Sequence, residues 1–266
     1  MDLLLLSFFA LLVSASLVIH LRRFRSVYGL NTGKVTAEAF SWIDAVFASL
    51  LVLFIVTQSL SSIAVPRQHS QFQSNTGLLV IAVLTQWVVI LGPILISLRI
   101  RGARIATLFG FDRLEVQKAV VLGVALLISA LPIIFASNAL VSAWLKTNQQ
   151  TDAQEIIQIF EGANSPAQRI PIILLAVVGA PLAEELVFRG YLYGVLKKYF
   201  GALASMVFTA VLFALIHAHI PSLLPLFLLA CVFTIAYESS GCLLVPMTMH
   251  ATFNAVNLLG VLFFSP

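Results

Sequence analysis

Apolar stretches of 15 to 27 residues alternate with short polar stretches along the whole chain. Eight of them are bounded by charged or turn-forming residues: 3–19, 41–63, 77–98, 119–140, 170–196, 202–220, 223–237 and 242–264. A helix that crosses the hydrocarbon core of a bilayer needs about 20 predominantly apolar residues. The pattern therefore predicts an all-α polytopic membrane protein with about eight transmembrane helices in a bundle.

The composition supports a membrane protein and excludes other classes. Of the 266 residues, 60% are hydrophobic and 10% are charged, whereas about 25% are charged in soluble domains. A soluble globular protein is therefore excluded. The few basic residues form no stripe interleaved with aromatic residues, so we expect the lipid bilayer as a partner and no nucleic acid. The two cysteines, Cys231 and Cys242, lie in or beside apolar stretches and are expected to be packing residues.

The 15 Lys and Arg residues divide unequally between the two sides of the predicted bundle. Only three of them, Arg67, Lys146 and Arg169, fall on the side where the chain begins, and the other twelve fall on the opposite side. Basic residues gather in the cytoplasmic loops of membrane proteins. We therefore expect an integral membrane protein with its N-terminus outside, in a bacterial-type plasma membrane.

The chain has one long polar connection, residues 146–169, which separates two groups of four predicted helices, 1–145 and 170–266. Within it, the stretch 151–160 has acidic residues in a first helical turn and apolar residues on one helical face. This pattern predicts a short amphipathic helix on the outer surface. A solvated loop is the alternative interpretation.

Three charged residues, Glu184, Glu185 and Arg189, lie within the fifth apolar stretch. An ionisable group inside the membrane is costly unless it is paired or faces water, so each one indicates a function. Glu185 and Arg189 are four residues apart, in the order that favours an ion pair on a helix. Glu184 points about 100° away from that face and has no partner within the stretch, which suits a general base. The alternative is an ion cluster that only packs helices together.

Polar residues of two further apolar stretches extend this pattern. His217 lies near the end of the sixth stretch, and His250 lies within the eighth. Asn254 follows His250 by four residues, so both side chains share one helical face. Two histidines and an amide in the membrane, together with a carboxylate pair, indicate a reactive site more than packing.

Two other acidic residues are expected to have ordinary roles. Asp44 comes early in the second stretch, where it is typical of an acid in the first turn of a helix. Glu238 directly precedes Ser239, Ser240 and Gly241, so we expect it to be a solvated carboxylate in a loop.

Three motifs follow one another on separate predicted helices: Glu184-Glu185-x-x-x-Arg189, Phe213-x-x-x-His217 and His250-x-x-x-Asn254. In this order they resemble the signature of the CPBP (ABI) family of intramembrane endopeptidases, which includes the type 2 CAAX prenyl endoproteases. The resemblance covers about residues 171–261, whereas the first four stretches match only in being hydrophobic. It implies a conical helical core around a water-filled cavity, and cleavage of a peptide or membrane-protein substrate, as in CAAX-type or peptide-precursor processing.

The resemblance also implies roles for individual residues, and 170–266 is then the catalytic core. Glu184 would be the general base, His217 would help to hold and activate a water, and His250 and Asn254 would donate hydrogen bonds to the oxyanion. The supporting residues would be Glu185 and Arg189.

Zinc is the open question about this site. One glutamate and two histidines can ligate zinc, but the chain has no His-Glu-x-x-His motif. If Glu184 were a zinc ligand, Glu185 would have to act as the base, and its pairing with Arg189 makes it a poor one. We therefore expect a glutamate mechanism with no metal and no other cofactor, with zinc as the alternative.

Two other functions are consistent with the same residues. Buried glutamates and histidines also form the proton relays of coupled transporters, but such transporters usually have repeated halves. Here the intramembrane polar residues lie almost entirely in the second half. The other alternative is a non-catalytic immunity or scaffold member of the same family.

Overall fold

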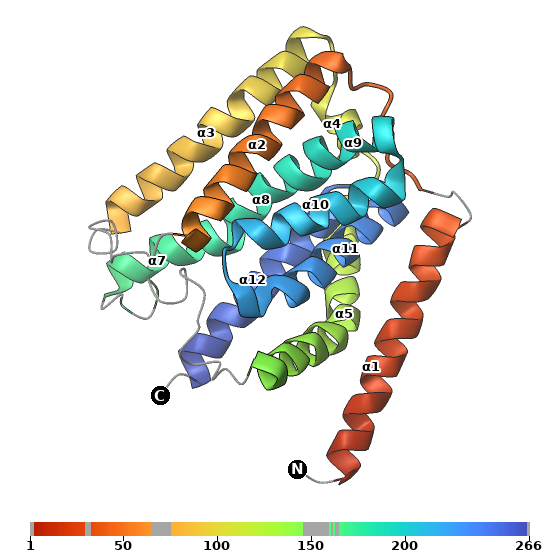
Figure 1. Ribbon diagram of the computed structural model, residues 1–266, viewed down its shortest axis with the longest axis vertical. Helices are drawn as coiled ribbons and strands as arrows, with labels where there is room; N and C mark the ends of the chain where they lie inside the picture. The colour runs from red at the N-terminus through yellow and green to blue at the C-terminus, as the bar shows by residue number, and fades with distance from the viewer. Residues whose placement is uncertain are drawn as a thin grey trace.

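The computed structural model describes residues 3–29, 33–64, 76–145, 160, 162 and 165–264, and all regular structure within them is helical (Figure 1). The elements are α1 (Leu3–Phe24), η1 (Arg25–Gly29), α2 (Trp42–Ala64), α3 (Thr76–Ile100), α4 (Ile105–Leu108), α5 (Val116–Leu145), α7 (Pro166–Leu174), η3 (Leu175–Gly179), α8 (Ala180–Glu185), η4 (Leu186–Leu192), α9 (Tyr193–Phe200), α10 (Ala202–Ile216), η5 (Ile220–Ser222), α11 (Leu223–Ser240) and α12 (Leu244–Phe264). The all-α polytopic fold class predicted from the sequence is confirmed.

All eight predicted stretches fall on helices. Among the described residues, six helical segments are long and apolar enough to cross a membrane by length and composition, and Pro166–Phe200, with 35 residues, is the longest of them. The sixth predicted stretch is shorter than expected, because α10 has only 15 residues and ends at Ile216. The helix from Pro166 begins inside the predicted outer loop, and the amphipathic helix predicted at 151–160 lies outside the described residues except for Phe160.

The helices form a bundle in which the residues of α5, α11 and α12 lie at the centre and α1 lies at the edge (Figure 1). α12 packs against α5, and α10 packs against α11. α1 is attached to α5 by polar contacts, in which the Ser16 hydroxyl donates to the Ser129 carbonyl and His20 Nε2 lies 3.2 Å from Ser129 Oγ. Large apolar side chains such as Leu4, Val88 and Trp144 are 69% to 84% exposed. A surface of this kind is expected where helices face lipid.

The loops with most of the basic residues meet at one end of the bundle, which we call the basic end. Asp44 lies there in the first turn of α2, where it accepts hydrogen bonds from the backbone N–H and the hydroxyl of Ser41 at 2.6 and 3.0 Å. Arg101, just past α3, forms an ion pair with Asp44 at 2.5 Å. Asp44 is therefore an acid at a helix N-terminus, as expected, but it is also buried and joins α2 to the end of α3.

Glu238 is not the solvated loop carboxylate that the sequence suggested, because it lies in α11 and is fully buried. Its Oε1 accepts hydrogen bonds from Tyr193 and Lys197. Its Oε2 accepts one from the backbone N–H of Val35 at 3.2 Å. The prediction was wrong because residues 33–40, which we call the cover segment, fold back over the end of α11, and this contact spans some 200 residues of sequence.

The cover segment closes the basic end of the bundle. Phe40 is 2% exposed, and its ring lies against Tyr191 with 5.9 Å between the ring centroids. Gly194 makes this approach possible, since a Cβ at that position would lie 2.3 Å from a carbon of the Phe40 ring. Lys197 Nζ also donates to the Val35 carbonyl at 2.7 Å. The loop before α2 is thus part of the packed core.

Candidate active site

The residues predicted for the site come from four parts of the chain, and the structure brings them together. Glu184 and Glu185 lie at the end of α8, and Arg189 lies in η4. His217 is the residue directly after α10, and α12 carries both His250 and Asn254. A cavity of about 490 Å³ is lined by all four residues predicted to be catalytic, namely Glu184, His217, His250 and Asn254.

The helix that carries the two glutamates changes its hydrogen-bond register around them. α8 is an α-helix of six residues, and π-helical segments, in which N–H groups bond five residues back, precede and follow it. In the register of η3 the carbonyl of Ala176 would accept from residue 181, but Pro181 has no N–H. Asn254 Nδ2 donates to this carbonyl at 2.8 Å instead. The proline thus creates the acceptor that fixes the Asn254 side chain.

Glu185 and Arg189 form the ion pair that their spacing predicts. Arg189 donates to Glu185 Oε1 at 2.7 Å, and both side chains are at most 1% exposed. His250 Nδ1 lies 3.0 Å from the same oxygen, so this nitrogen carries the proton that it donates. Glu185 therefore orients the imidazole of His250 and is itself neutralised by Arg189.

Arg189 is held by more than its carboxylate partner. It donates to the Ala230 carbonyl at 3.2 Å. Its guanidinium carbon lies 4.5 Å from the ring centroid of Phe213 and 5.2 Å from that of Phe233. Both distances are within the range of cation–π attraction. The motif Phe213-x-x-x-His217 thus places an aromatic ring beside the charged group of another helix.

Glu184 is in a different situation from its neighbour. Its side chain is 23% exposed and lines the cavity. Its buried Oε2 has no hydrogen-bond partner among the described residues and lies 3.9 Å from His250 Nε2. Because the side chain is partly exposed and lines the cavity, the carboxylate as a whole is available to a molecule there.

His217 presents one ring nitrogen to the backbone of its own helix. Nδ1 donates to the Phe213 carbonyl at 2.7 Å, so the lone pair of the neutral ring is at Nε2. The next residue, Ala218, has φ +46°, a left-handed conformation that is uncommon outside glycine. This residue ends the helical path of α10, and His217 lines the cavity at the point where the helix stops.

The donor set was also compared with what a metal ion requires. Within the described ranges, no group of three or more His, Cys, Asp or Glu side chains is arranged to hold a metal ion. Glu185 Oε1 already accepts from Arg189 and His250, so it offers little to a metal.

The cavity also has lining residues that were not predicted. They are polar or aromatic residues of the first helices and of α12: Gln58, Ser59 and Ser62 from α2, Gln86 and Trp87 from α3, and Asn257 from α12. The signal for them was present in the sequence, because glutamine is rare within a transmembrane helix unless it faces a cavity or a partner. The family motifs could not indicate the residues of α2 and α3, because both helices lie outside the motif region, and Asn257 is not a motif position.

One comparison with known proteins gives a match, and the match covers the region of the site. Residues 166–256 match the family model described as "Type II CAAX prenyl endopeptidase Rce1-like". The matched region contains all six residues predicted for the site. No curated protein and no solved structure matches the chain. Over residues 166–256 the chain is therefore similar to the Rce1-like family of type II CAAX prenyl endopeptidases.

Proposed function

We propose that the protein hydrolyses a peptide bond inside the membrane with Glu184 as the general base. The observation that carries this proposal is the contrast between the two adjacent glutamates. Glu185 is buried and paired with Arg189 and His250. Glu184 lines the cavity with a side chain that is 23% exposed and forms no ion pair with an arginine or lysine among the described residues. A general base needs a free oxygen within reach of water and substrate.

The first step forms a bond between a water oxygen and the substrate carbonyl carbon. In this proposal the water is held between Glu184 and Nε2 of His217, and Glu184 takes one of its protons. The negative charge that develops on the carbonyl oxygen accepts hydrogen bonds from His250 and Asn254. Donors that are fixed before the reaction stabilise such a charge effectively, and Glu185 and Ala176 fix these two.

The second step breaks the carbon–nitrogen bond. Glu184 returns its proton to the leaving amine, the oxyanion re-forms the carbonyl, and the water oxygen stays on the carbon as a hydroxyl, which gives a carboxylic acid and an amine. The Asn254 amide has a second N–H besides the one used by Ala176. When its ring carries both protons, His250 can donate through Nε2 while Nδ1 donates to Glu185.

The glutamate mechanism uses no metal ion and no other cofactor. Its support is that the second carboxylate, Glu185, is held by Arg189 and is not free to act as a base beside a metal-bound Glu184. We expect activity in detergent to persist in excess chelator, and elemental analysis to find no stoichiometric zinc. One zinc per chain, with activity lost when it is stripped, would replace this mechanism by a metalloprotease mechanism.

The proposed setting is a bacterial-type plasma membrane, with the N-terminus outside. Its support is the unequal division of basic residues, most of which lie at the basic end. The proposed substrate is a peptide or a segment of a membrane protein, cleaved in CAAX-type or precursor processing.

The test is Glu184→Gln in a peptide-cleavage assay with the purified protein in liposomes. The change keeps the shape of the side chain and removes the base, and general-base catalysis contributes about 10²- to 10⁴-fold to a rate. The control is Glu115→Gln, because the Glu115 side chain is 72% exposed at the start of α5. Thermal unfolding should be similar for both variants. Unchanged cleavage by Glu184→Gln would refute the mechanism.

A further inference from the structure

The cavity is displaced along the bundle, away from the basic end. On α2 its first lining residue, Leu51, lies about 14 Å along the helix from Trp42, and its last, Ser62, lies about 3 Å from the helix end at Ala64. On α10 it reaches Ile216, the last residue of the helix. Both helices begin at the basic end. The cavity therefore occupies the half of the bundle that is farther from the basic loops.

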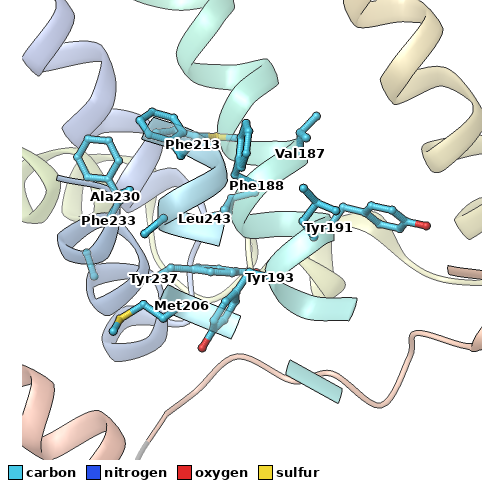
Figure 2. Packing of buried hydrophobic residues seen from close by; sticks show 14 of the residues in the cluster. Val187, Phe188, Tyr191, Tyr193, Met206, Phe213, Ala230, Phe233, Tyr237 and Leu243 are labelled. Atoms are coloured by element: carbon cyan, nitrogen blue, oxygen red, sulfur yellow. The ribbon is translucent and has the colours of Figure 1, made fainter. Parts of the chain in front are cut away.

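Between the cavity and the basic end the core is densely filled. This region is filled by buried aromatic side chains. Figure 2 shows Phe188 and Phe213 on one side of the cluster and Tyr193 and Tyr237 on the other. The cover segment closes the core beyond the Tyr193 hydroxyl through the hydrogen bonds to Glu238. A substrate would have to displace both layers to arrive from this direction.

The opposite side of the cavity is bordered by the short helix α10 and by polar side chains in part of its wall, and the buried Phe160 belongs to one cluster with Ala176 and Leu258, which also line the cavity. α10 is about 22 Å long, which is shorter than the hydrocarbon core of about 30 Å. Non-helical backbone at membrane depth is tolerated where it lines a water-filled cavity. The walls on this side carry Gln58, Gln86 and Asn257. Ser59 is 4% exposed, and its hydroxyl has no hydrogen-bond partner among the described residues. A wall of this kind suits the main chain of a peptide.

The distribution of basic residues indicates on which side of the membrane the polar half of the cavity lies. The described basic residues at the basic end include Arg22, Arg23, Arg25, Lys34, Arg99, Arg101, Arg104, Arg113, Lys118, Lys197 and Lys198. Because basic loops stay in the cytoplasm, the polar half of the cavity faces the other side.

From this arrangement we infer that the cavity receives its substrate from the non-cytoplasmic face of the membrane. The substrate is then an exported peptide, or a segment of a membrane protein on that side, whose main chain lies against Gln58, Ser59 and Gln86. The inference depends on the proposed function only in calling the bound molecule a substrate. A C-terminal peptide presented from the cytoplasm would meet the filled side of the core, so of the two kinds of processing proposed above the inference favours precursor processing over CAAX-type processing.

The test is chemical labelling of single cysteines in intact cells and in permeabilised cells. Cys231 and Cys242 are first replaced by alanine in the full chain, and thermal unfolding checks that this background is folded. Gln58→Cys reports on the cavity wall, Glu38→Cys on the exposed part of the cover segment, and Val88→Cys on a lipid-facing position that is 69% exposed. The probe is a sulfonated maleimide that does not cross membranes.

In intact cells we expect Gln58→Cys to be labelled at least about ten-fold faster than Val88→Cys, because a thiol must ionise in water to react. Glu38→Cys should react only after permeabilisation. The inference is wrong if Gln58→Cys is not labelled in intact cells, whether because the chain is inverted or because the cavity is closed. Labelling needs no catalysis, so the same series in the Glu184→Gln background keeps this result separate from the proposed mechanism.

Discussion

The ion pair between Glu185 and Arg189 is the part of the site whose energetic contribution can be calculated most directly. Both side chains are at most 1% exposed, so solvent screens the pair little. Removing one partner of a buried pair leaves the other charge uncompensated and costs about 3–5 kcal/mol. For a chain of this size, such a loss lowers the midpoint of thermal unfolding by about 6–20 °C. Arg189→Met and Glu185→Gln should each show a loss of this kind.

The double variant, Glu185→Gln with Arg189→Met, separates the pair from its surroundings. Arg189→Met also removes the hydrogen bond to Ala230 and the contacts with the rings of Phe213 and Phe233. These losses occur in the single and in the double variant, so they cancel in a double-mutant cycle. The double variant leaves no uncompensated charge, and we expect a coupling free energy of about 2 kcal/mol or more.

The measurement is thermal unfolding of the four proteins in one detergent at one pH. If the losses of the two single variants add up to that of the double variant within about 0.5 kcal/mol, the pair does not stabilise the fold, and the argument for a neutralised Glu185 fails. The same four proteins should also be assayed for cleavage. Because Glu185 orients His250, Glu185→Gln should lower kcat more than it raises KM.

Three further predictions concern other parts of the molecule. Gly102→Ala, at φ +80° in open space, should cost about 1–2 kcal/mol in unfolding free energy. Gly110 has φ +71°, and a Cβ at this position would lie 1.8 Å from a carbonyl oxygen. Gly110→Ala should therefore cost about 1–3 kcal/mol more than Gly102→Ala, which is roughly the penalty of overpacking. Equal losses in the two variants would contradict this contact. Lys197→Met, which leaves Glu238 buried without its cation, should cost about 3 kcal/mol. Lys118→Met, in an exposed pair, should cost less than about 1 kcal/mol. Similar melting temperatures of the two lysine variants would contradict a stabilising role of the pair between Lys197 and Glu238. In the cleavage assay, we expect chelation to leave the rate unchanged.

Helical periodicity and hydropathy were sufficient to predict the helices and the ion pair between Glu185 and Arg189. The spacing of Glu185 and Arg189 decides that they share a helical face, and no other part of the chain can change that. The end of α10 was missed by four residues because the left-handed Ala218 has no signature in its own residue type. A sequence of apolar residues up to Ile220 looks the same whether the helix continues or stops.

The contacts between distant segments could not be predicted from local patterns. Glu238 followed a stretch that looked like a turn to solvent, yet Val35 and Lys197 reach it from two other segments. The hydrogen bond between Asn254 and Ala176 depends on a π-helical register, and single-residue propensities do not predict such a register. Both interactions needed the packed structure, while the candidate residues that line the cavity together were identified from their types and order.

The π-helical segment η3, which lies close to the site, can lose one residue without changing the directions of the helices on either side of it. In a regular α-helix, deleting one residue rotates everything after it by about 100°. A π-helical turn contains one residue more than an α-helical turn, so deleting Val178 from η3 would leave the helices on both sides facing the same directions. Pro181 would then stand four residues after Ala176 instead of five, and the Ala176 carbonyl would still lack a backbone donor. A related sequence can thus gain or lose one residue in η3 while Glu184 and Asn254 keep their relative positions.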